Sequence, residues 1–146
     1  MPSTYLALNA HIIFSTKDRL PSIPESKLNE THAFMGGVVK KLGVTPVQIG
    51  GVEDHVHLLL GFKATHSIAN IVQEVKKHST KWLREEAPNF SRQTGYAAYT
   101  ISPERMSGVI KYIAGQREHH KSMSFDEERL MLLKLAGIEF DPEYLD

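Results

Sequence analysis

The chain of 146 residues is 41% hydrophobic and 23% charged, which fits one folded domain with its own core, expected over residues 1–146. It has no cysteine and no apolar run near the roughly 18 residues of a membrane helix, which excludes disulfides, thiolate zinc sites and a membrane span and favours the cytoplasm. The net charge of zero is unevenly distributed. Residues 125–146 hold seven acids and two bases, a net of −5, so residues 1–124 carry +5, a bias compatible with phosphate binding.

The first forty residues predict a strand, a loop and a helix. Residues 5–15 are rich in Leu, Ile and Phe with polar residues interspersed, which favours a strand. Two prolines indicate a loop over residues 16–24. Apolar residues near helical spacing predict a helix over residues 26–42, and Gly43 is a typical residue to end it.

The middle of the chain predicts a hairpin followed by a second helix. Residues 44–49 and 55–62 are typical of strands, and the glycine-containing segment 50–54 between them favours a tight connection. Ser67 can cap a helix that extends over residues 68–87, because a serine oxygen at that position accepts a backbone N–H.

The last third predicts a short strand and two helices. The strand covers residues 96–102, and the helix after it covers residues 103–121 with Ser102 as its cap and Pro103 in its first turn. A final helix over residues 125–136 ends at Gly137 and opens an acidic tail, 125–146. The order β-α-β-β-α-β-α-α predicts an α+β fold: a ferredoxin-like antiparallel sheet with helices packed on one face, plus a C-terminal helical tail.

Two histidines lie on the second strand of the predicted hairpin. His55 and His57 are two residues apart, and strand side chains alternate between faces, so both imidazoles project from the same face. A strand offers two ligands to one metal ion in this way. Two polar residues on an exposed strand face are the alternative, and the pair alone does not exclude it.

A tyrosine and a glutamine share one face of the helix over 103–121. Tyr112 and Gln116 are four residues apart, which makes them neighbours on the helix surface. Tyr112 is at the edge of an apolar stripe that includes Ile113, so a half-buried packing role is the alternative to a chemical one.

Together these segments resemble the single-tyrosine HUH transposases of the IS200/IS605 type, and most closely the branch associated with repetitive extragenic palindromes (REP). The resemblance rests on the histidine strand DHVHLL (54–59) and the helix motif Tyr-x-x-x-Gln (112–116). It extends to HIIFSTKDR (11–19), GYAAYTIS (95–102), HHK (119–121) and the tail (132–141). Asp18 departs from the pattern, since many members have an aromatic residue there.

The resemblance implies a metal-dependent enzyme that cuts and rejoins single-stranded DNA in a cytoplasm of the bacterial type. It makes Tyr112 the nucleophile, which forms a 5′-phosphotyrosine link, and makes His55, His57 and Gln116 the ligands of Mg²⁺ or Mn²⁺. It also implies a DNA strand folded as a hairpin and a homodimer paired through sheet edges. Two alternatives stay open: a non-catalytic or domesticated DNA-binding descendant, and a metal-dependent phosphodiester hydrolase that does not use Tyr112.

Several basic residues and histidines are candidates for contact with DNA. The residues are Lys17 and Arg19 after the first strand, Lys77, Lys81 and Arg84 on the second helix, and His119 and His120 after Gln116. An ordinary solvated helix face is the alternative for the second-helix residues, and favourable placement at a helix C-terminus is the alternative for the two histidines.

Overall fold

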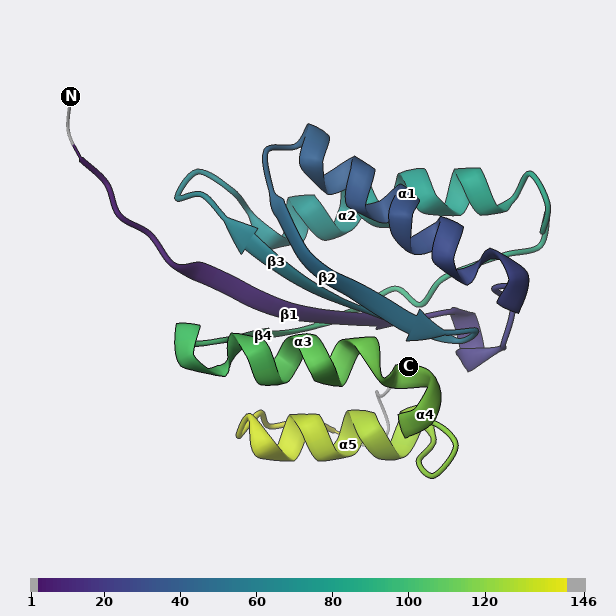
Figure 1. Ribbon diagram of the computed structural model, residues 1–146. Helices are drawn as coiled ribbons and strands as arrows, with labels where there is room; N and C mark the ends of the chain where they lie inside the picture. Colours follow the sequence, from purple (N-terminus) through teal and green to yellow (C-terminus); the bar gives the residue numbers. More distant parts are fainter. Residues whose placement is uncertain (1–2, 142–146) are drawn as a thin grey trace.

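The computed structural model describes residues 3–141 and has a four-stranded antiparallel sheet at its centre (Figure 1). The strand order is β2-β3-β1-β4, with β1 at Leu8–Ser15, β2 at Thr45–Val52, β3 at His55–Phe62 and β4 at Ala97–Thr100. Each strand starts or ends within three residues of its predicted bounds. Residues 142–146, the end of the predicted acidic tail, lie outside the described residues.

Helices cover both faces of the sheet. α1 (Leu28–Lys41) and α2 (Ile68–Leu83) lie on one face, and α3 (Met106–Ala114), α4 (Gln116–His119) and α5 (Phe125–Leu135) lie beyond the other (Figure 1). Short 3₁₀ turns occur at Lys17–Arg19, Glu25–Lys27 and Pro103–Arg105. The ferredoxin-like α+β prediction is confirmed, with two helices on one face as expected. The structure adds that α3 covers the opposite face.

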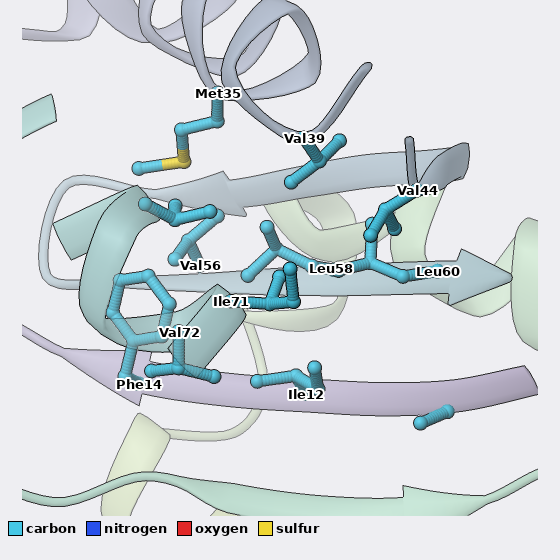
Figure 2. Close-up of a cluster of buried hydrophobic side chains, with 12 residues drawn as sticks. Ile12, Phe14, Met35, Val39, Val44, Val56, Leu58, Leu60, Ile71 and Val72 are labelled. Carbon is cyan, nitrogen blue, oxygen red and sulfur yellow. The ribbon is translucent and has the colours of Figure 1, made fainter. Parts of the chain in front are cut away.

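The hydrophobic core lies between the sheet and the pair α1 and α2 (Figure 2). Alternate residues of β1 and β3 point into it, including Ile12 and Phe14 from β1 and Val56 and Leu58 from β3. The helices contribute Met35, Val39, Ile71, Val72 and Val75. Because successive strand residues point to opposite faces, the residues between these apolar ones face α3.

The helix ends agree with the predicted signals except in the region around Ser102. Ser67 accepts a hydrogen bond from the backbone N–H of Asn70, and Gly43 and Gly137 have the positive φ angles that end helices. Ser102 forms no side-chain cap. The predicted continuous helix over 103–121 is broken at Gly115 into α3 and α4.

A glycine in β2 lets α3 approach the sheet closely. A Cβ atom on Gly50 would lie 2.6 Å from the carbonyl oxygen of Ile113, a contact that folded proteins do not tolerate. Gly50 pairs with His57 across the sheet. The glycine therefore allows the helix that carries Tyr112 to pack closely against β2, beside the strand that carries His55 and His57.

The two edges of the sheet differ. β2 forms one edge and contains Pro46, next to a shift in register between Pro46 and Gln48. β4 forms the other edge and is four residues long.

Within residues 3–141, no helix is both long enough and apolar enough to cross a membrane.

Candidate active site

The face of the sheet opposite the core carries three histidines. His11 on β1 and His55 and His57 on β3 are all at least 96% buried, and none of them faces α1 or α2. In the register of the sheet, His57 is opposite Ile13 and His55 is opposite Ser15. The predicted common face of His55 and His57 is present, and it is buried beneath α3 and α5 instead of being exposed.

The hydrogen bonds of His55 indicate a charged imidazole. Its Nδ1 lies 2.7 Å from Asp54 Oδ1, and its Nε2 lies 3.0 Å from Gln116 Oε1. Both partners are acceptors, so both ring nitrogens donate. Burial lowers the pKa of His55, but the hydrogen bonds with Asp54 and Glu128 outweigh it and raise the pKa to about 9. The ring also stacks on Phe125 of α5, with centroids 4.3 Å apart.

His57 and His11 form a neutral pair. His57 Nε2 lies 3.0 Å from Glu128 Oε1 and donates to it, so its Nδ1 accepts from His11 Nε2 at 2.7 Å. Burial lowers the pKa of His57 to about 4. Burial and the neighbouring His57 together lower the pKa of His11 to about 3. His11 was not predicted as a site residue. It fixes the ring orientation of His57 as an outer ligand partner would.

Tyr112 and Gln116 reach the same group of side chains across the helix break at Gly115. The Tyr112 hydroxyl donates a hydrogen bond to Glu128 Oε2, and its ring centroid lies 5.7 Å from that of His57. Burial and the neighbouring Glu128 carboxylate raise the pKa of Tyr112. Gln116 is buried, with its side-chain nitrogen 3.4 Å from the Tyr112 carbonyl oxygen. The predicted neighbourhood of the two residues is therefore present.

Glu128 on α5 is a second residue, after His11, that sequence reasoning missed. It is fully buried, and its Oε1 lies 3.0 Å from His57 Nε2, 3.3 Å from His55 Nε2 and 3.2 Å from His120 Nε2. Burial of the carboxyl group opposes its charge, but hydrogen bonds from His120, His55 and His57 lower its pKa well below the usual range. A signal was present, because Glu128 follows the apolar Phe125 by one helical turn in a tail otherwise counted as acidic.

The two histidines after Gln116 also join the site. His120 Nε2 lies 2.8 Å from Gln116 Oε1, and its Nδ1 lies 2.6 Å from the carbonyl oxygen of Met123. His119 Nε2 lies 3.1 Å from Glu128 Oε2, and its ring centroid is 5.2 Å from that of Tyr112. The structure thus brings both beside the nucleophile candidate, and their predicted contact with DNA stays a prediction.

The donor set fits a divalent cation. Nitrogen or oxygen atoms of His55, His57, His120 and Glu128 all lie within 4.8 Å of one another. Neighbouring donors are 2.8–3.3 Å apart, as in the His120–Gln116 and His55–Glu128 pairs. An octahedral ion with ligands at about 2.1 Å places adjacent ligand atoms about 3 Å apart. Imidazole, amide and carboxylate donors together suit Mn²⁺, and the oxygen donors suit Mg²⁺.

The predicted basic residues divide between two places. Lys17 and Arg19 follow β1 at the end of the sheet near the histidines, where Arg19 pairs with Asp126 of α5 at 3.0 Å. Asp18 and Arg19 both have φ near 55°, and aspartate tolerates this region better than a bulky aromatic residue does. Together with Arg92, this loop lines a hollow of about 570 Å³.

The basic residues of α2 lie on the core side of the sheet, away from Tyr112. Lys77, Lys81 and Arg84 are exposed, and Arg84 Nε donates to the carbonyl oxygen of Phe90 at 2.8 Å. The structure does not bring these three residues to the histidine site. Their role as a phosphate track stays a prediction.

Comparisons with known proteins agree with this fold. A proposed transposase from Deinococcus radiodurans R1 is 22% identical with a TM-score of 0.65, over 80% of this chain and 95% of that one. A REP-associated tyrosine transposase bound to a REP hairpin is 11% identical with a TM-score of 0.63, over 82% and 73%. No curated protein matches. The family model described as "Transposase IS200 like" matches residues 4–116, and the chain therefore belongs to the IS200-like family of DNA transposases.

Proposed function

We propose that this transposase nicks and rejoins single-stranded DNA through a covalent link between Tyr112 and a 5′ phosphate, with the help of a divalent cation. The observation that carries the proposal is the convergence of the half-buried Tyr112 with the buried Gln116, His55 and His57 in one cluster. The Tyr112 hydroxyl and the imidazole of His57 contact opposite oxygens of the same Glu128 carboxylate. A phosphate seated beside the histidines would therefore lie next to the nucleophile.

The reaction exchanges one phosphodiester bond for another. The Tyr112 oxygen attacks phosphorus, the bond from phosphorus to the 3′ oxygen breaks, and its electron pair stays on that oxygen. Overall, the phenol proton is exchanged for a proton on the departing 3′ hydroxyl. Rejoining reverses these changes, so the energy of the broken bond is kept in the phosphotyrosine link and no separate energy source is needed.

His55, His57 and Gln116 are the proposed ligands of Mg²⁺ or Mn²⁺. When bound, the ion supplies positive charge that polarises the phosphate and favours the phenolate. The chain itself holds Tyr112 in its protonated form, because burial and the Glu128 carboxylate both oppose the phenolate charge. His11 and Asp54 orient the two histidines through the hydrogen bonds described above.

The proposed substrate is single-stranded DNA folded as an imperfect hairpin. The structural relative bound to a REP hairpin supports this substrate class for a chain of the same fold. A duplex resists the bending needed to bring one strand into a buried site, whereas a single strand beside a hairpin does not. We expect the hairpin to bind more tightly than a perfect duplex of the same sequence in a gel-shift competition.

We also propose that the protein is a homodimer. The support is the family membership, together with exposed apolar residues in the extended segment before β1. Tyr5 is 90% exposed and Leu6 is 50% exposed, so both side chains are available for contact with a second chain. Sedimentation at micromolar concentration should give the mass of two chains, and a species of one chain would contradict this proposal.

The decisive experiment compares Tyr112→Phe with Tyr99→Phe. Hairpin DNA is incubated with Mn²⁺, and products are separated on a denaturing gel and by mass spectrometry. The wild-type protein should give a nucleotide adduct on the peptide that contains Tyr112, and Tyr112→Phe should bind DNA but neither cut it nor form the adduct. Tyr99 is the matched control, because it is also beside the site, with its ring centroid 6.1 Å from that of His11.

The outcomes separate the proposed function from its alternatives. Cleavage by Tyr112→Phe without an adduct would replace the transposase mechanism with hydrolysis by the metal site alone. An adduct on Tyr99 would move the nucleophile to β4. Binding of hairpin DNA without cleavage by the wild-type protein would favour the non-catalytic descendant.

A further inference from the structure

Glu128 is a buried anion at the centre of the site, and neither the family match nor the proposed ligand set includes it. The region that matches the family model ends at residue 116. Glu128 belongs to α5, which begins nine residues later, at Phe125. Its carboxylate is completely buried, which is rare for a glutamate without a specific partner. The protein therefore places a negative charge in this position through a segment outside the matched region.

We propose that Glu128 is a ligand of the divalent cation, so that α5 completes the metal site. This inference rests on the proposed metal-dependent function. It assigns the two carboxylate oxygens different partners: Oε1 binds the ion, and Oε2 accepts the hydrogen bond from the Tyr112 hydroxyl.

The positions of the donor atoms support Oε1 as a ligand. Its distances to the Nε2 atoms of His57, His120 and His55 are 3.0, 3.2 and 3.3 Å. These are the separations expected between adjacent ligands of one octahedral ion, at about 3 Å. Oε1 thus stands in the same relation to His55 as Gln116 Oε1 does, at 3.0 Å.

The charge of the site supports the same assignment. To hold the ion, His55 must give up its Nε2 proton, so His55, His57 and Gln116 would then all be neutral ligands. They would leave the two positive charges of the ion uncompensated in a buried position. A carboxylate offsets one of these charges, and carboxylate oxygens are the ligands that Mg²⁺ and Mn²⁺ prefer. Asp54 does not fill this role, because its Oδ1 contacts the outer nitrogen of His55.

The first turn of α5 holds Glu128 in place. Ser124 and Glu127 form a reciprocal capping box at the start of the helix, one residue before Glu128. Phe125, one turn earlier, stacks on His55. The helix is thus tied to the histidine strand next to the carboxylate, as expected for a ligand with a fixed position.

The test measures Mn²⁺ affinity without DNA, by electron paramagnetic resonance of the free ion in titrations of metal-stripped protein. Glu128→Gln keeps the shape and the acceptor oxygen but removes the charge, and we expect its affinity to fall by about 10-fold to 100-fold. Glu118→Gln is the control for charge, because Glu118 on α4 is exposed and pairs with Lys121 at 2.9 Å. Glu118→Gln should bind within about twofold of the wild-type protein.

Glu128→Asp keeps the charge and should recover part of the affinity, which a purely structural role would not produce. It also serves as the second variant should Glu128→Gln not fold, as monitored by circular dichroism without metal. Unchanged affinity in Glu128→Gln, with binding lost in His57→Ala, would overturn this inference and leave the proposed function intact. Tighter binding in Glu128→Gln would also overturn it, since the carboxylate would then compete with the ion. Suppose instead that Glu128→Gln binds Mn²⁺ more weakly but the wild-type protein forms no DNA adduct on Tyr112. That result would reject the proposed function and leave the assignment of Glu128 as a ligand intact.

Discussion

The two faces of the same sheet have opposite chemistry, although they are built from alternate residues of the same strands. On β3, Val56 and Leu58 pack against α1 and α2, while His55 and His57 face α3 and α5. Both faces are buried to the same extent, with each of these four side chains at most 1% exposed. The difference between them is thus one of polarity and not of access to solvent.

This comparison shows how stability and chemistry are separated within one strand. The core face needs only apolar shape, and its burial provides most of the free energy of folding. The site face buries imidazoles, an amide and a carboxylate, which are costly unless each has a partner. Such a face contributes little stability for its size, and its function is to hold charged groups in fixed positions.

The largest expected effect is on the site face. His57→Ala removes a proposed metal ligand, and we expect cleavage of hairpin DNA to fall by at least about 10³-fold, equivalent to about 4 kcal/mol of transition-state stabilisation. The substitution also removes a hydrogen-bond partner from His11 and Glu128, so we expect the free energy of unfolding to fall by about 1–3 kcal/mol while the variant stays folded. Cleavage assays with Mn²⁺ and urea unfolding of the same sample check both parts, and full cleavage in EDTA would contradict the prediction.

The adjacent residue on the core face should behave in the opposite way. Leu58→Ala leaves a cavity between the sheet and the helices, and we expect the free energy of unfolding to fall by about 2–5 kcal/mol. The rate of cleavage per folded molecule should stay close to that of the wild-type protein. A large loss of cleavage in the still-folded variant would show that the two faces are not separable.

A third substitution tests the close contact between β2 and α3, the helix that carries Tyr112. Gly50→Ala forces a methyl group against the carbonyl oxygen of Ile113, and we expect it to cost about 1–3 kcal/mol of stability and to lower cleavage by displacing α3. Gly37→Ala is the control, since a methyl group there meets no atom within 4 Å. That change in helix α1 should stabilise the protein by up to about 1 kcal/mol. Equal effects of the two substitutions on cleavage would refute the close approach.

The smallest effect concerns the pH dependence of stability on the core side. His32 on α1 has a buried Nε2 that finds no hydrogen-bond partner among residues 3–141. Burial, assisted by the charge of Arg92, lowers the pKa of His32 to about 4. The folded protein therefore binds fewer protons than the unfolded chain between about pH 6.5 and pH 4, so stability is lost as the pH falls through that range. We expect His32→Gln to remove about 1 kcal/mol of the loss between pH 7.5 and pH 5.5.

Urea unfolding at the two pH values measures this difference, and the Mn²⁺-dependent cleavage at pH 7.5 should be unchanged in His32→Gln. An identical pH dependence in the variant and the wild-type protein would mean that His32 is not held neutral in the folded state.

Local patterns predicted the parts of the site that lie on single elements. The period of two along a strand placed His55 and His57 on one face, and helical spacing made Tyr112 and Gln116 neighbours. The order of strands and helices predicted the ferredoxin-like sheet, and glycines marked the ends of α1 and α5. The histidine pair, the Tyr112–Gln116 pair and the helix ends depend on residues within a few positions of each other, whereas the fold class follows from the order of the elements along the chain.

The features that sequence reasoning missed depend on contacts between distant segments. Glu128 meets His57 across a separation of 71 residues. The spacing of Glu128 from Phe125 places both residues on one face of α5, but it does not indicate which strand that face packs against. The predicted helix over 103–121 continued through Gly115, because a single glycine in a helical pattern usually weakens a helix without ending it. Lys77, Lys81 and Arg84 have the spacing of one helix face, as predicted. The pattern could not reveal that α2 lies on the side of the sheet away from Tyr112.

The irregular edge of the sheet has a consequence for how the protein avoids uncontrolled self-association. An edge strand offers unpaired backbone groups that another chain can copy, which is how sheets extend into fibres. Pro46 lacks the N–H that such pairing needs, and the register shift beside it interrupts the flat ladder along β2. The opposite edge, β4, is only four residues long. Both edges therefore limit pairing with further molecules to short stretches, which favours small closed assemblies over open-ended ones.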